Sequence, residues 1–161
     1  MIFPVLTLAA SAVLALVFLG LCINVSRHRI STRISLGDGS GNVSGNVSGN
    51  GSGNGSGNGS QNYAVGEEKS APRLFVASRS LANFAEYVPL SLVLLLIIEM
   101  VGAPRWAVAT LAGMLVVGRL LHPIGMQLPA PNPLRAGGIL LQWLVLLLGA
   151  IYGLLLVPGL L

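Results

Sequence analysis

Four long stretches of the chain are almost entirely apolar, and polar, glycine-rich or proline-containing segments separate them. A helix needs about 20 consecutive apolar residues to cross the hydrocarbon core of a bilayer. The pattern therefore predicts an all-α membrane protein, a bundle of four transmembrane helices forming one domain over residues 1–161. The predicted spans lie at about 3–27, 74–101, 105–127 and 134–157.

The first apolar stretch is interpreted as a retained helix rather than a cleaved leader. A secretory signal peptide carries positive charge before its apolar core. Here no charge precedes the core, and Arg27, His28 and Arg29 follow it.

The composition supports lipid as the solvent. Hydrophobic residues make up 53% of the 161 residues and charged residues 9%, whereas a soluble domain carries about 25% charged residues. The net charge is +4, but the basic residues flank apolar runs instead of forming a patch with interleaved aromatics, so we expect no nucleic-acid partner. Cys22 is the single cysteine, which excludes an intrachain disulfide and a cysteine-based zinc site. No metal site is predicted.

The segment 37–62 has a different character, because it consists largely of glycine, asparagine and serine. Five four-residue repeats, Gly-Asn-Val-Ser or Gly-Asn-Gly-Ser, run from residue 41 to residue 60. Such a composition cannot bury a core, and it predicts a flexible tether with a span of about 28 Å. We interpret it as an expanded repeat or an engineered linker without a function of its own.

The distribution of Lys and Arg predicts the orientation in the membrane, because cytoplasmic loops carry an excess of these residues. The first connection, the third and their flanks are basic, whereas Arg105 alone marks the opposite side. Both of these connections are therefore predicted to be cytoplasmic and both termini outside. The basic side holds Arg27, Arg29, Arg33, Lys69, Arg73, Arg79, Arg119 and Arg135.

Charged groups inside predicted membrane helices are costly and mark functional sites. Arg79, Asn83 and Glu86 are spaced to form one stripe on the second helix, and Tyr87 borders it. A purely structural reading remains open, in which Arg79 extends its guanidinium to lipid phosphates and Glu86 compensates its charge. Partner groups lie on the third helix, Arg119 and His122, and on the fourth helix, Arg135 and Gln142.

Glu99 lies at the opposite end of the second helix, away from this stripe. We expect it to pair with Arg105 across the turn between the second and third helices, in a structural role.

The second helix carries the motif Arg79-x-x-x-Asn83-x-x-Glu86-Tyr87-x-Pro89, which resembles the signature of the MAPEG family (membrane-associated proteins in eicosanoid and glutathione metabolism). Val25-Ser26-x-x-Arg29 is similar to the family's entry to its first loop. Gly118-Arg119-x-x-His122, with Arg135 sixteen residues after Arg119, resembles its prostaglandin E synthase branch.

The resemblance implies a trimeric four-helix bundle that binds glutathione between neighbouring subunits at the cytoplasmic side. It implies that Arg135 stabilises the glutathione thiolate and that Arg29 approaches the site from the first helix. The other residues that it assigns to glutathione are Arg79, Asn83, Glu86, Tyr87, Arg119 and His122.

The chemistry of these side chains suits glutathione, which has two carboxylates, one ammonium group and one thiol. Arginine forms forked hydrogen bonds to carboxylates, and Glu86 suits the ammonium group. A nearby guanidinium lowers the pKa of a thiol and so favours the nucleophilic thiolate.

Three positions depart from the eicosanoid-metabolising members: Ala82 replaces an arginine, Met126 a tyrosine and Ala136 a serine. We therefore expect a glutathione-dependent transferase or peroxidase that acts on lipophilic electrophiles, rather than a dedicated prostaglandin or leukotriene enzyme. The alternative is a non-catalytic protein of the same fold, in which the polar cluster is structural or binds another anion. A small four-helix exporter is disfavoured because the first helix lacks an acidic residue for proton coupling.

Overall fold

The computed structural model describes residues 3–34, 72–129 and 131–157, and these residues form four α-helices and no strand. The predicted glycine-rich tether at 37–62 lies outside the described residues. All four helices are long and apolar enough to cross a membrane, which confirms the predicted fold class. The helices are α1 (Val5–Thr32), α2 (Pro72–Met100), α3 (Arg105–Met126) and α4 (Pro133–Leu156).

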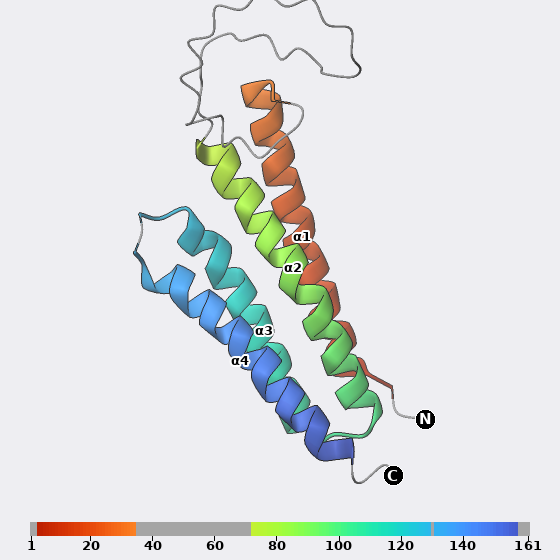
Figure 1. Cartoon of the computed structure of the whole chain (residues 1–161). Coiled ribbons are helices and arrows are strands. Elements are labelled where there is room, and N and C mark those ends of the chain that lie inside the picture. Colours follow the sequence, from red (N-terminus) through yellow and green to blue (C-terminus); the bar gives the residue numbers. More distant parts are fainter. Residues whose placement is uncertain (1–2, 35–71, 130, 158–161) are drawn as a thin grey trace, which may run out of the picture.

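The helices run alternately up and down (Figure 1). The start of α1, the α2–α3 turn and the end of α4 lie at one end of the bundle, and the α3–α4 connection lies at the other, which we call the loop end. Both α2 and α3 pack against each of the other three helices, α3 and α4 share the largest interface, and α1 and α4 make no backbone contact. The α2 and α3 helices therefore occupy the centre of the arrangement, and α1 and α4 lie on either side of it.

The core is a cluster of apolar side chains at helical spacing. Leu14 of α1, Leu95 of α2 and Leu115 of α3 are almost completely buried, and Val145 of α4 joins them. Large apolar side chains also cover the outside of the bundle, especially on α4. A helix that is apolar all round suits lipid or a second subunit as its neighbour. The remaining core members are Ala10, Leu21, Phe84, Val88, Leu111 and Ala112.

Glycines allow α3 and α4 to approach closely. A Cβ atom built on Gly138 would lie 2.8 Å from the carbonyl oxygen of Gly118 and 2.8 Å from Cβ of His122. Small residues permit such contacts between membrane helices, where packing drives association. The largest interface of the bundle therefore depends on residues without side chains.

A glycine marks the end of α2 and an asparagine marks the start of α4, the two helix ends that precede and follow α3 in the sequence. Gly102 has a φ of 92°, and its N–H donates to Glu99 O while Ala103 N–H donates to Ile98 O; this is the Schellman pattern that ends many helices. At the other end, Asn132 Oδ1 accepts from Arg135 N at 2.9 Å and caps α4.

Glu99 caps a neighbouring helix instead of forming the predicted ion pair with Arg105. Its carboxylate accepts hydrogen bonds from Leu6 N at 2.9 Å and from Thr7 N at 2.8 Å. The first N–H groups of a helix lack partners within the helix and carry partial positive charge, and α1 has no side-chain cap of its own. Arg105, the predicted partner, attracts the Glu99 carboxylate without forming an ion pair with it. The prediction missed the start of α1 because it considered only neighbours in sequence.

Candidate functional site

The predicted stripe on α2 lies at the boundary between the bundle interior and its outer surface. Arg79 and Glu86 are exposed, whereas Asn83 and Tyr87 are half-buried. Phe84, next to Asn83, points into the core. The stripe therefore divides into an inward-facing part and an outward-facing part.

The inward-facing part is a hydrogen-bonded network that joins three helices. Arg119 is 1% exposed; its Nη1 donates to Asn83 Oδ1 at 2.7 Å and its Nε donates to Gln142 Oε1 at 2.8 Å. Gln142 Nε2 in turn donates to Ser91 Oγ at 2.6 Å, and Ser91 Oγ donates to Tyr87 O at 2.9 Å. Polar groups buried in a membrane require such partners, so this network links α2, α3 and α4 at the level of the stripe.

The charge of Arg119 is stabilised by aromatic rings and amide oxygens. Its Cζ lies 5.5 Å from the centre of the Tyr87 ring and 6.0 Å from that of Phe84, within the range of cation–π attraction. Its Nη2 is buried and has no hydrogen-bond partner among the described residues. The guanidinium therefore retains a donor group for a further acceptor.

His122 lies one helical turn after Arg119 and is 2% exposed. It occupies the close contact between α3 and α4, where its backbone faces Gly138. The fold thus buries His122 and Arg119 on one face of α3, and Arg119 links this face to the half-buried Asn83 of α2.

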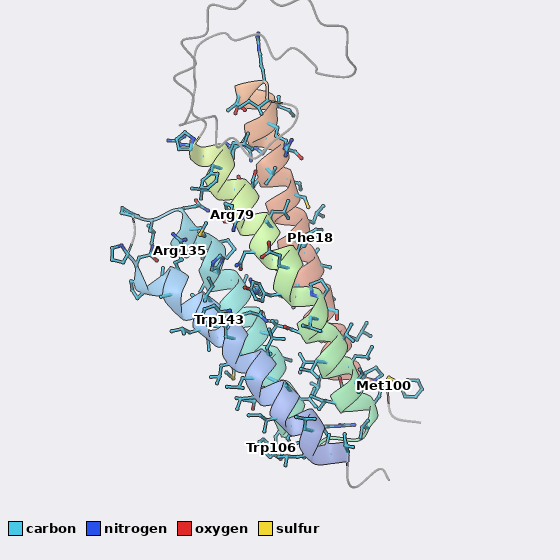
Figure 2. The ribbon with its side chains drawn as sticks, viewed as in Figure 1. Phe18, Arg79, Met100, Trp106, Arg135 and Trp143 are labelled. Carbon is cyan, nitrogen blue, oxygen red and sulfur yellow. The ribbon has the colours of Figure 1, made fainter. Side chains whose placement is uncertain are left out.

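The outward-facing part consists of Arg79, Glu86 and Arg135, all exposed. Figure 2 shows Arg79 on α2 and Arg135 on α4 toward the loop end of the bundle. In the part of the chain that the structure describes, no hydrogen bond or ion pair engages these three side chains. They are charged groups on membrane-spanning helices, and none of them has an ion-pair partner among the described residues.

Arg29 lies apart from these residues. It is half-buried and occupies the last turn of α1, a helix that makes no backbone contact with α4. One copy of the chain therefore does not place the backbone positions of Arg29 and Arg135 side by side.

Ser91 is the member of the network that was not predicted from the sequence. It is a small polar residue in an otherwise apolar run of α2, eight residues after Asn83. This isolated position is the sequence signal that could have identified it. Among the described residues, no group of three or more His, Cys, Asp or Glu side chains is placed to hold a metal ion.

The family model described as the MAPEG family matches residues 7–155. The match spans all four helices except for two residues at the start of α1 and one at the end of α4. No curated protein and no solved structure matches the chain.

Proposed function

The chain belongs to the MAPEG family, as the resemblance predicted, and on this premise we propose that it is a membrane-embedded glutathione-dependent transferase or peroxidase acting on lipophilic electrophiles. Membership makes it an integral, multi-pass membrane protein of a family concerned with glutathione and eicosanoid metabolism.

One observation carries the proposal: two cations and one carboxylate lie exposed on membrane-spanning helices without partners among the described residues. Glu86 is 14 residues into α2, about 21 Å from its start at 1.5 Å per residue. A carboxylate at that depth cannot reach water along the membrane and requires a bound ligand or a neighbouring subunit. Glutathione supplies the complementary charges, with two carboxylates for Arg79 and Arg135 and an ammonium group for Glu86.

Asn83 and Tyr87 border the proposed glutathione site, on the side of the stripe that faces the bundle interior. Because Arg119 engages Oδ1 of Asn83, the amide nitrogen of Asn83 keeps its two donors for the peptide. Nη2 of Arg119 is a further donor at this level. We assign Arg79, Asn83, Glu86, Tyr87, Arg119 and His122 to glutathione binding.

Arg135 is assigned to catalysis. It lies in the first turn of α4, where the partial positive charge of the helix end adds to that of the guanidinium. Both favour the glutathione thiolate over the thiol, and each pKa unit by which the thiol is lowered corresponds to about 1.36 kcal/mol. In the transferase reaction the thiol loses its proton, the sulfur forms a bond to an electrophilic carbon, and the leaving group departs with its electron pair.

The site also requires a second subunit. We propose a homotrimer in which α1 of the neighbour covers the exposed stripe and brings its Arg29 to the glutathione. This arrangement accounts for the exposure of Glu86, since the contact between subunits removes it from lipid. We further propose that the loop end faces the cytoplasm, in accordance with its basic residues.

The test is glutathione binding to the full chain in detergent, followed by calorimetry and by ultraviolet absorbance of the thiolate. The wild type is expected to bind glutathione and to show the thiolate signal. Arg79→Ala should weaken binding about tenfold, the equivalent of a charged hydrogen bond. Arg135→Ala should lose the thiolate signal, and Arg105→Ala, at the opposite end of the bundle, should change neither.

The non-catalytic alternative is favoured by one observation, the internal bonding of Asn83, Arg119 and Gln142. In that case glutathione binds without a thiolate signal or does not bind, and variants of Asn83 lose stability alone. Absence of the signal in wild type at saturating glutathione would reject the catalytic proposal.

A further inference from the structure

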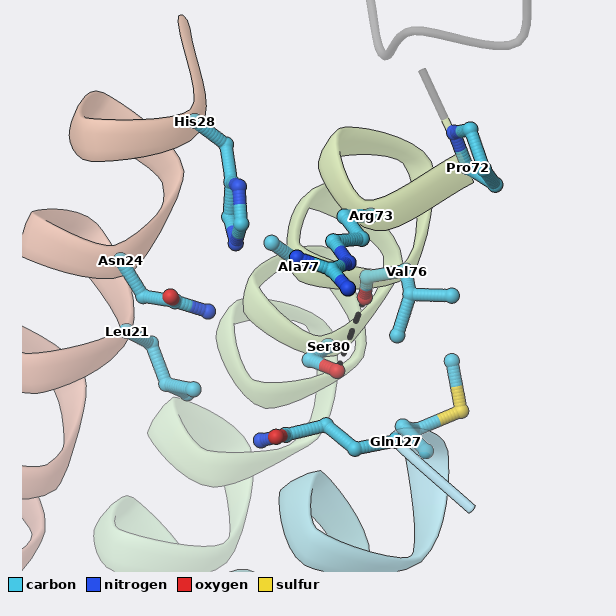
Figure 3. Close-up of a pocket in the computed structure, with 10 residues that line it drawn as sticks. Leu21, Asn24, His28, Pro72, Arg73, Val76, Ala77, Ser80 and Gln127 are labelled. Carbon is cyan, nitrogen blue, oxygen red and sulfur yellow. Dashed lines mark hydrogen bonds between the residues drawn. The ribbon is translucent and has the colours of Figure 1, made fainter. Parts of the chain in front are cut away.

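A cavity of about 490 Å³ lies between α1 and α2 at the loop end of the bundle. Asn24 and His28 of α1 line one side, Arg73 and Ser80 of α2 line another, and Gln127 at the end of α3 closes it (Figure 3). The cavity is thus formed within one subunit, by helices that pack directly against each other.

Among the described residues that line this cavity, Asn24, His28, Arg73 and Gln127 carry hydrogen-bond donors, and none is a carboxylate. The hydroxyl of Ser80 donates to Val76 O at 2.9 Å. The side chains of Asn24, His28, Arg73 and Gln127 point into the space between the helices (Figure 3). Within the described part of the chain, no hydrogen bond or ion pair engages the side chains of Asn24, His28 and Arg73. An arginine with several neighbouring donors suits the oxygens of a phosphate group.

The start of α2 lies beside the cavity, since Pro72 and Arg73 belong both to the first turn of this helix and to the lining. The N–H groups of a first helical turn point outward and favour anions. Arg73 and the amide side chains of Asn24 and Gln127 therefore face one space beside the start of α2.

Leu21, Ala77 and Met126 add apolar surface to the lining. A cavity lined by both polar and apolar side chains, at the end of a membrane-spanning bundle, suits the level at which lipid head groups meet acyl chains.

This cavity is distinct from the proposed glutathione site. On α2 its lining residues Arg73, Val76 and Ser80 lie about 100° around the helix from the stripe of Arg79 and Glu86, at 3.6 residues per turn. The two sites therefore open on different faces of α2 and can be separated by mutation.

We propose that this cavity binds a phosphate group, either in the head group of an anionic lipid or as a soluble phosphate compound. The Arg73 guanidinium contacts the phosphate oxygens, while Asn24, His28 and Gln127 donate further hydrogen bonds. An additional cationic group on the ligand is disfavoured, because no carboxylate of the described chain lines the cavity.

The test titrates the full chain in detergent with short-chain phosphatidylglycerol and, separately, with phosphatidylcholine of the same chain length. Phosphatidylglycerol should bind at least tenfold more tightly. Arg73→Gln and His28→Gln should each weaken its binding, Arg73→Gln by about tenfold. Arg27→Gln removes the same charge from the same end of the bundle, at a position of α1 outside the cavity lining. This control should change the binding of phosphatidylglycerol by less than twofold.

Competition with inorganic phosphate and glycerol phosphate identifies the source of the group. Displacement of the lipid at millimolar phosphate assigns the site to soluble phosphates, and persistence of the lipid assigns it to head groups. Equal weakening by Arg27→Gln and Arg73→Gln, or equal binding of the two lipids, would overturn the proposal. Glutathione binding should be unchanged in Arg73→Gln; its parallel loss would show that the cavity belongs to the glutathione site. His28→Gln provides the same comparison if Arg73→Gln fails to fold.

Discussion

Arg119 on α3 donates a hydrogen bond of 2.7 Å from Nη1 to Oδ1 of Asn83 on α2, inside the membrane-spanning part of the bundle. The guanidinium is 1% exposed, and in the described structure its charge meets amide oxygens and aromatic rings rather than a carboxylate. This hydrogen bond distinguishes Asn83 from Arg79 and Glu86, although all three residues lie on one stripe of α2. Asn83 has a structural partner, whereas the two charged residues have none in the described part of the subunit.

Replacing Asn83 by alanine should reduce the stability of the bundle. The substitution leaves a buried guanidinium without one of its acceptors, and the expected cost is about 1–3 kcal/mol. Thermal unfolding in detergent, followed by circular dichroism, measures it. Arg79→Ala is the matched control on the same stripe, because Arg79 is exposed and no described residue bonds to its side chain. Equal losses in both variants would show that the bond to Arg119 contributes nothing specific.

Replacing Glu99 by leucine should loosen the start of α1. The carboxylate accepts from two backbone N–H groups, Leu6 and Thr7, and removing a helix cap costs about 0.5–2 kcal/mol. Hydrogen exchange at these two amides should accelerate, while exchange in the middle of α1 should change little. Glu86→Leu, an exposed carboxylate on the same helix, should leave the exchange of these amides unaltered. Unchanged exchange in Glu99→Leu contradicts the capping role.

Two adjacent glycines of α4 should respond oppositely to alanine. A Cβ on Gly138 would lie 2.8 Å from Gly118 O and from His122 N, whereas a Cβ on Gly137 meets nothing within 4 Å. Gly138→Ala should therefore destabilise the bundle by about 1–3 kcal/mol through overpacking. Gly137→Ala should be neutral or stabilising by up to about 1 kcal/mol, because alanine is the better helix former. Similar unfolding midpoints for the two variants would refute the close α3–α4 contact.

The proposed orientation predicts that the repeats at 41–60 remain unmodified. Each repeat contains an Asn-x-Ser acceptor for N-glycosylation, for example at Asn42 and Asn50, and acceptors on the cytoplasmic side are not glycosylated. Expression in a eukaryotic cell should give a protein whose electrophoretic mobility is unchanged by endoglycosidase. A shift on digestion would place the loop end, and the proposed glutathione site, on the other side of the membrane. An acceptor sequence placed before residue 5 serves as the positive control.

Part of the candidate site followed directly from the sequence. Charged residues are easily recognised within apolar runs, and helical spacing places Arg79, Asn83 and Glu86 on one stripe. Spacing within one helix, however, does not reveal what the neighbouring helix presents. For this reason the sequence assigned Glu99 to Arg105, its neighbour across a turn, and did not find Leu6 and Thr7, more than 90 residues away. The hydrogen bond of Ser91 was not predicted for the same reason, since its partner is Gln142 on α4.

The sequence by itself determined that this chain has four membrane helices, because lipid demands long apolar runs and leaves few alternatives to a helix. It also determined which helices carry polar groups and which end of the bundle is basic. Only the tertiary structure decided which of those groups are paired: Asn83 and Arg119 form a hydrogen bond inside the subunit, while Glu86, Arg79 and Arg135 lie exposed on its surface. The physical reason is that hydrogen bonds between helices depend on how α2, α3 and α4 pack, and that packing rests on contacts such as Gly118 against Gly138, which no periodicity along a single helix specifies.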